Sequence, residues 1–180
     1  MAKAFPLLTI DPEGPVGANA ALMLHIRLGE MLRHAKDIDD VAAVDELHAM
    51  RIAAKRLRYT MELFADHLSD PEAKQLRWLL ARTKKVQEMI GEIHDRDVRV
   101  PMAEEFLRRT SERQPENGVG LRRLIEAETR ERERIYREFI LYWADLRGKY
   151  LARMARLIAV LIAPEAGAAL PEPAAETDEA

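Results

Sequence analysis

The spacing of apolar residues constrains the fold of this chain more than any other feature. Between residues 18 and 163, apolar side chains recur mainly at steps of three and four residues. This is the period at which residues line one face of an α-helix. No segment of four or more residues alternates apolar and polar positions with the Val, Ile and Thr content of a strand. We therefore predict an all-α protein, an elongated antiparallel bundle of about five or six helices.

Helix-ending residues divide this region. Asp39 or Asp40 can cap a second helix, and Pro71 suits the first position of a third. The sequence GEIHDRDVRVP, which begins at Gly91 and ends at Pro101, predicts a break in the helix. The predicted helices cover residues 18–36, 40–68, 71–90, 101–109 and 121–145, with a sixth helix, or a continuation past Gly148, that ends before Pro164.

The two ends of the chain differ in composition from the helical region. Residues 1–17 contain only a short apolar stretch that Pro6 interrupts, so they suit neither a secretion signal nor a membrane span. Residues 164–180 are rich in Ala, Pro and acid and cannot bury enough apolar surface to become ordered. We predict an extended segment at 1–17, a helical domain at 18–163 and a disordered acidic tail at 164–180, in a cytoplasmic protein.

The charge of the chain is unevenly distributed. The sequence has 28 Lys and Arg against 31 Asp and Glu, a net charge of −3, which argues against a uniformly basic nucleic-acid-binding protein. Five of the acids lie in the tail, and without them residues 1–163 carry +2. The chain has no cysteine, which excludes disulfides, Cys-ligated zinc, iron–sulfur clusters and thiol catalysis.

The segment from Glu46 to Phe64 carries two stripes on one predicted helix. One stripe is apolar and predicts a core face: Leu47, Met50, Ala54, Leu57, Met61 and Phe64. The stripe beside it is basic: His48, Arg51, Lys55 and Arg58. No acid lies between His48 and Glu62, whereas helices facing solvent usually mix the two signs of charge. These groups repel one another mildly, and a bound anion would compensate for the repulsion.

The third predicted helix repeats this pattern. Its segment from Lys74 to Lys85 contains no acid, and Arg77 and Lys84 lie on one flank of an apolar face. If the second and third helices pack antiparallel, their basic flanks form one groove, lined by His48, Arg51, Lys55, Arg58, Arg77 and Lys84. The fifth helix mixes Arg with Glu and predicts a solvated face, on which Arg130 and Arg137 are candidates for extra contacts. Ordinary solvated surface is the alternative interpretation of all these basic residues.

Two motifs resemble a known family. The sequence VDELHAMRIAAKRLRYTMELF at 44–64 is similar to the signature helix of the CHAD domains, the conserved histidine α-helical domains, and KKVQEMIGEIHDRDV at 84–98 is similar to their second signature. The resemblance implies an all-helical fold whose basic central groove binds inorganic polyphosphate, without catalysis and without a cofactor. By position it implies the ligands His48, Arg51, Lys55, Arg58 and Lys84. Arg56 corresponds too, although its angle points it away from the basic stripe.

The resemblance also bears on assembly. CHAD proteins usually contain two helical repeats that face each other across the groove, in a chain of well over 200 residues, whereas the length of this chain suits about one repeat. We therefore expect a homodimer that rebuilds the second wall, and association with polyphosphate granules. His94 occupies a position where the family pattern suggests an Asn-like residue, so its role stays open.

Two other functions compete with polyphosphate binding. His94, Asp95 and Asp97 could form part of a metal-dependent phosphohydrolase site, although the other histidines do not supply a recognisable ligand set. The structural alternative is that Asp95 caps the fourth helix and Asp97 pairs with an arginine. A nucleic-acid-binding helical protein is the second competitor, since nucleic acid is also a polyanion. We expect no catalytic residue and no bound metal.

Overall fold

A computed structural model of the chain describes residues 3–7, 10–68, 70–111 and 118–163. These residues form four α-helices and no strand, which confirms the all-α prediction. The elements are α1 (Val16–His34), α2 (Val44–Phe64), the 3-10 turn η1 (Ala65–His67), α3 (Asp70–Ser111) and α4 (Gly118–Ile162). Among the described residues, no helix combines the length and the apolar character that a membrane crossing requires.

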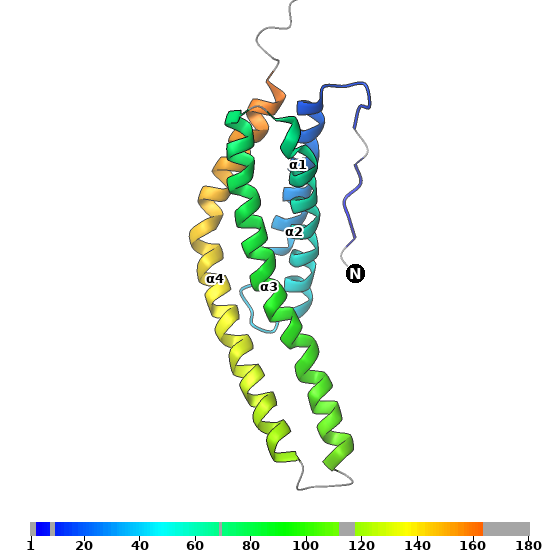
Figure 1. Cartoon of the computed structure of the whole chain (residues 1–180), viewed down its shortest axis with the longest axis vertical. Coiled ribbons are helices and arrows are strands. Elements are labelled where there is room, and N and C mark those ends of the chain that lie inside the picture. Colours follow the sequence, from blue (N-terminus) through cyan, green and yellow to red (C-terminus); the bar gives the residue numbers. More distant parts are fainter. Residues whose placement is uncertain (1–2, 8–9, 69, 112–117, 164–180) are drawn as a thin grey trace, which may run out of the picture.

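The four helices form an antiparallel bundle, with successive helices running in opposite directions (Figure 1). α1 packs against α2 and α4, and α3 also packs against α2 and α4. α1 and α2 have 19 and 21 residues, whereas α3 and α4 have 42 and 45, so the two long helices extend beyond the short ones. We call this two-helix extension, residues 95–111 and 118–134, the arm, and the four-helix remainder the body.

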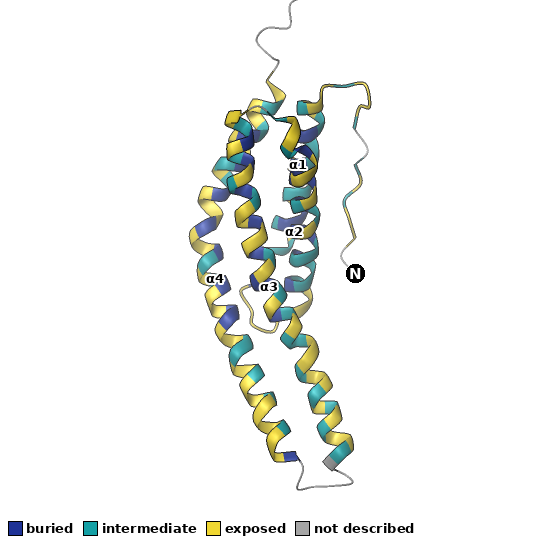
Figure 2. Cartoon of the chain, viewed as in Figure 1, coloured by how far each residue is buried: buried dark blue, intermediate teal, exposed yellow. Residues whose placement is uncertain are grey.

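The hydrophobic core lies in the body (Figure 2). All six residues predicted for the apolar stripe of α2 are buried. Across the bundle, α3 and α4 meet through Thr83 and Tyr150, whose buried hydroxyl groups lie 2.6 Å apart and satisfy each other. The arm differs: among residues 95–110 and 118–134, only Gly118 is buried.

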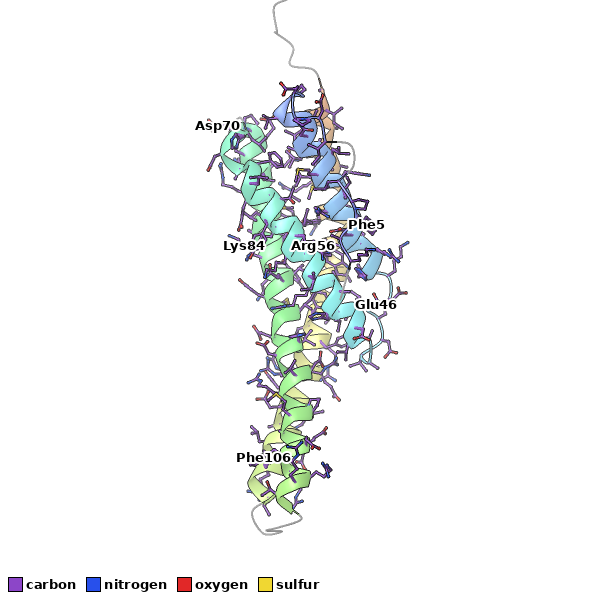
Figure 3. The ribbon with its side chains drawn as sticks, turned by 90° about the vertical axis from the view of Figure 1, so that its right-hand side faces the viewer. Phe5, Glu46, Arg56, Asp70, Lys84 and Phe106 are labelled. Atoms are coloured by element: carbon purple, nitrogen blue, oxygen red, sulfur yellow. The ribbon has the colours of Figure 1, made fainter. Side chains whose placement is uncertain are left out.

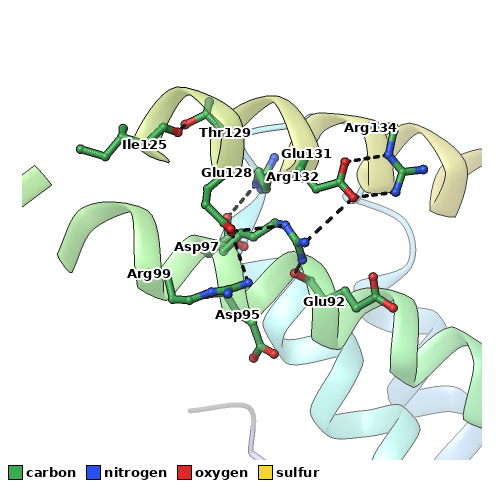
Figure 4. Close-up of polar contacts among 11 residues, drawn as sticks. Glu92, Asp95, Asp97, Arg99, Ile125, Glu128, Thr129, Glu131, Arg132 and Arg134 are labelled. Atoms are coloured by element: carbon green, nitrogen blue, oxygen red, sulfur yellow. Dashed lines mark hydrogen bonds and ion pairs between the residues drawn. The ribbon is translucent and has the colours of Figure 1, made fainter. Parts of the chain in front are cut away.

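The predicted break at 91–101 is wrong, because α3 is continuous from Asp70 to Ser111 with Pro101 inside it. Proline cannot donate the backbone hydrogen bond that a helix expects at that position. Contacts with α4 compensate on the side before the proline, where Arg96 and Arg99 lie 3.6 and 3.3 Å from Glu128 (Figure 4). Since no helix begins after the motif, Asp95 caps none.

The C-terminal part of the bundle is also simpler than five or six helices. α4 continues through Gly148, so the predicted continuation past this glycine is correct and there is no separate sixth helix within the described residues. A glycine inside a helix costs only about 1 kcal/mol relative to alanine. The buried side chains of Leu146 and Tyr150 on either side contribute more than that through burial. The predicted acidic tail at 164–180 lies outside the described residues.

The N-terminal segment lies beside α1. The backbone amide of Phe5 donates to the Glu30 carboxylate, and the Arg27 guanidinium donates to the Phe5 carbonyl at 3.2 Å. Glu30 is only 2% exposed, and Arg27 pairs with it at 2.7 Å. A buried carboxylate is tolerated only with such partners, and here the segment and α1 both supply hydrogen bonds to one oxygen of this carboxylate.

Candidate functional site

The basic stripe of α2 lies along the line where α2 packs against α3. On α2 this line carries His48, Arg51, Lys55 and Arg58, at steps of three, four and three residues. On α3, which runs antiparallel, it carries Lys84, Gln87, Gly91 and His94, again at steps of three, four and three. We call these eight residues the α2–α3 seam. Matching steps on antiparallel helices pair the residues in register.

The lower end of the seam is formed by two histidines and an arginine. The rings of His48 and His94 stack with their centroids 4.7 Å apart and their planes 27° apart. One turn further along, Arg51 passes over Gly91, and a Cβ atom at Gly91 would lie 3.5 Å from the arginine Nε. That distance is an ordinary van der Waals contact, so Arg51 lies close against α3 at Gly91.

The upper end of the seam carries basic side chains together with an acidic one. The Lys84 ammonium lies 3.3 Å from a Glu62 carboxylate oxygen, and the Arg58 guanidinium lies 3.8 Å from the same oxygen. The guanidinium of Arg58 also stacks 4.6 Å from the Tyr59 ring centroid, and the Lys55 ammonium lies 5.8 Å from it. Glu62 and Tyr59 thus hold the cations of the seam in place. Figure 3 shows Lys84 and Arg56 on their helices.

The seam concentrates polar atoms that are buried without a hydrogen-bond partner among the described residues. Five such atoms lie on it: Nδ1 of His48, Nε of Arg51, Nε of Arg58, Oε1 of Gln87 and Nδ1 of His94. Buried polar groups in native proteins are nearly always hydrogen-bonded. Four of the five atoms are nitrogens of basic side chains, so the most direct way to satisfy them is an anion with several oxygens.

The environment of His48 favours its neutral form in the free protein. Burial lowers the pKa of His48 below its usual value, and the nearby His94 and Arg51 lower it further. Asp45 acts in the opposite direction as the smallest contribution. An anion bound at the seam would reverse this balance, because a neighbouring negative charge favours the charged imidazole.

Of the remaining predicted ligands, three lie away from the seam and one continues it. Arg56 faces α1, where its guanidinium lies 3.8 Å from the buried Glu30 carboxylate. Arg130 and Arg137 are exposed on α4, which packs against α1 and α3, and Arg130 pairs with Glu126 at 3.9 Å. Arg77 is exposed on α3, two turns before Lys84 and on the same flank, so it extends the line of the seam.

The three residues of the competing metal site do not converge: Nδ1 of His94 lies 3.8 Å from the Asp95 carboxylate, but Asp97 faces α4. His94 stacks on α2, whereas Asp97 accepts a hydrogen bond at 2.7 Å from Arg132 of α4 (Figure 4). Asp97 therefore pairs with an arginine, as the structural alternative predicted. Asp95 is 67% exposed. Nowhere in the described part of the chain do three or more His, Asp or Glu side chains gather as metal ligands would.

The sequence prediction missed the contribution of Gln87 and the pairing role of His94. A signal for both was present, because the α3 residues 84, 87, 91 and 94 repeat the spacing of the basic stripe of α2 in reverse order. That match becomes visible only once the register between the two helices is known.

Comparison with protein families agrees with this geometry. The model of the CHAD domain matches residues 3–104, more than half of the chain and a range that includes both sides of the seam. No curated protein and no solved structure matches the chain significantly.

Proposed function

Because the chain belongs to the CHAD domain family, we propose that the α2–α3 seam binds inorganic polyphosphate and that it is a binding site without catalysis. The observation that carries the proposal is the row of four basic nitrogens on the seam that are buried without a hydrogen-bond partner among the described residues. The proposed ligands are His48, Arg51, Lys55, Arg58 and Lys84, with Arg77 extending the row. Each phosphate unit offers several oxygens to such donors.

The shape of the seam suits a linear polyanion. His48 and Arg58 are ten residues apart, a distance of about 15 Å along the helix. Arginine forks can bind two phosphate oxygens each, and a lysine supplies a mobile point charge. A linear chain with a charge on every unit can contact these groups in succession, whereas a single small anion would reach only one or two of them.

The aromatic residues favour polyphosphate over single-stranded nucleic acid. Binding of single strands commonly uses aromatic faces on which bases stack. Trp78 lies near two guanidinium groups, with Arg82 at 5.2 Å and Arg153 at 4.4 Å from its ring centroid. Tyr59 likewise contacts Arg58 and Lys55. In the described structure these rings already have cationic neighbours, so bases would have to displace them.

The test compares two triple variants of equal charge. One removes Arg51, Lys55 and Arg58 from the seam by substitution with alanine. The control removes Arg123, Arg147 and Lys149, which are likewise two arginines and one lysine but are exposed on α4. Binding of long-chain polyphosphate, duplex DNA and single-stranded RNA is measured by titration over a range of salt concentrations, with circular dichroism to confirm the fold.

We expect the wild-type chain and the control to bind polyphosphate more tightly than either nucleic acid, with an affinity that falls as salt rises. The seam variant should lose most of this affinity and have a shallower salt dependence. Equal affinity of the two folded variants would refute the assignment to the seam. Tighter binding of RNA or DNA than of polyphosphate would favour the nucleic-acid function.

A further inference from the structure

The outer face of α3 in the arm exposes three large apolar side chains. Val98, Met102 and Phe106 follow one another at steps of four residues and are 46%, 67% and 62% exposed. Residues that are four apart lie on the same side of a helix. A shallow hollow of about 440 Å³ lies around Met102 and Phe106 and is also lined by Arg109. A continuous apolar stripe of this kind on a surface usually marks an interaction site.

This stripe continues the face of α3 that α2 covers in the body. Met102 follows Lys84 by 18 residues, which make five full helical turns, so the two residues point to the same side of α3. α2 begins only at Val44, and its His48 contacts α3 at His94. α2 extends one further turn to Val44, which this register places beside Val98, and from there α3 continues for about three and a half turns without a helix on this face among the described residues.

The charges beside the stripe match those of a second copy that runs antiparallel. Asp95 lies seven residues before Met102 and Arg109 lies seven residues after it, two turns away in each direction. If a second α3 packed antiparallel with Met102 facing Met102, Asp95 of each copy would lie at the height of Arg109 of the other. Val98 of each copy would likewise lie at the height of Phe106 of the other.

We propose that the arm is a homodimer interface, in which the arms of two chains pack antiparallel through this face of α3 around a two-fold axis near Met102. Such an interface is isologous, because the same patch serves both copies. It does not depend on the proposed ligand. It also affects the seam. Arg109 of the second copy would face Asp95, the residue next to His94, and would add a cation at the lower end of the seam.

Cysteine crosslinking tests the geometry directly. The natural chain has no cysteine, so a single Met102→Cys substitution places one thiol per chain, next to the proposed axis. We expect mild oxidation to give a covalent dimer in high yield. The control is Leu141→Cys, whose position is 72% exposed on α4 outside the proposed interface. Equal crosslinking at both positions would overturn the proposal.

The mass in solution tests the apolar contact. We expect light scattering to give the mass of two chains for the wild type at micromolar concentration. Phe106→Glu should weaken the dimer roughly tenfold or more, since it places two carboxylates in an apolar contact. Leu141→Glu, the matched control, should leave the mass at two chains. A wild type with the mass of one chain, or a Phe106→Glu variant that stays dimeric, would overturn the proposal.

A charge exchange tests the orientation. Asp95→Arg and Arg109→Asp should each weaken the dimer, because each variant sets like charges opposite one another twice in the two-fold pair. The double variant restores opposite charges at both positions and should recover dimerisation. Because both sites are exposed, circular dichroism should show unchanged helix content. Failure of the double variant to exceed either single variant would rule out the antiparallel register.

Discussion

The body and the arm share the same two long helices but are stabilised in different ways. In the body, α3 and α4 bury Leu79, Phe139 and Tyr150 almost completely. In the arm, Gly118 is the only buried residue among 95–110 and 118–134. Side-chain ion pairs join α3 to α4 at the base of the arm, the closest being Arg132 with Asp97 at 2.7 Å. Burial stabilises the body, whereas the arm has mainly polar contacts.

The body and the arm also differ in the kind of group that lacks its usual contacts. Within the described part of the chain, the seam on the body buries polar atoms that lack hydrogen bonds, and the arm exposes apolar side chains that lack a packing partner. Both features lie on the same side of α3, which α2 covers as far as about residue 98 and leaves open beyond it. One helix can therefore present a surface suited to an anion and, a few turns later, a surface suited to another protein chain.

The largest difference between the regions should appear in one pair of leucine substitutions on α4. Leu146 lies in the body and is 5% exposed, whereas Leu124 lies in the arm and is 52% exposed. Leu146→Ala should lower the free energy of unfolding by about 2–5 kcal/mol through lost burial and a cavity. Leu124→Ala should lower it by less than about 0.5 kcal/mol. Denaturant unfolding followed by circular dichroism measures both. Similar losses would mean that the arm has a core of its own.

The second prediction concerns the base of the arm. Asp97→Ala leaves Arg132, which is 12% exposed, without its carboxylate partner, and should cost about 1–3 kcal/mol. The loss should be local, so hydrogen exchange should accelerate in residues 95–110 and not in α2. Glu126→Ala is the control, because its pair with Arg130 is exposed and contributes about 0–1 kcal/mol. Faster exchange throughout the chain would show that arm and body unfold together.

The sequence predicted the body better than the arm, for a physical reason. The apolar stripe of α2 follows from the helical period alone, and all six of its residues are buried. The break before Pro101 was predicted from local signals alone. The helix is continuous there, and this part of α3 contacts residues of α4 such as Glu128, which lie far along the chain. Tertiary contacts of this kind override local preference and leave no periodic pattern in the sequence.

The candidate site divides in the same way. The spacing of His48, Arg51, Lys55 and Arg58 on one helix was sufficient to predict that they share a face. The position of Arg56 was not fully predictable, because its partner Glu30 lies on another helix and is buried there with Arg27. The pairing of His48 with His94 depends on the register between α2 and α3, which no single-helix pattern contains.

The third prediction is a pH dependence of polyphosphate binding. Because the pKa of His48 is lowered in the free protein and a polyanion raises it, binding should take up a proton. Affinity should then increase as pH falls from about 7.5 to 5.5. The total increase should be about tenfold for each unit by which the pKa of His48 in the complex exceeds its pKa in the free protein. His48→Gln should flatten this dependence, whereas His25→Gln, at an exposed position on α1, should not. Titration calorimetry in buffers of different ionisation enthalpy also measures the proton uptake.

The same shift fixes the sign of a stability effect. A lowered pKa means that the folded state resists protonation of His48, so the unfolded chain binds more protons below the ordinary histidine value of about 6.5. The contribution of His48 to stability is therefore present above that pH and is lost as pH falls through the lowered pKa. Without ligand, wild type should lose more stability than His48→Gln on acidification, and a loss equal in both would contradict the assigned pKa shift.

The smallest effect is expected at Glu62, an acid that contacts two cations of the seam. Its carboxylate lies 3.3 Å from Lys84 and 3.8 Å from Arg58, and it is 38% exposed. Glu62→Gln keeps the shape of the side chain but releases both cations for the ligand. Exposed ion pairs contribute about 0–1 kcal/mol, so polyphosphate affinity should rise only about two- to threefold. Glu133→Gln, an equal charge change at an exposed position on α4, is the control. An unchanged or weaker affinity in Glu62→Gln would mean that this carboxylate orients the two cations for the ligand and does not compete with it.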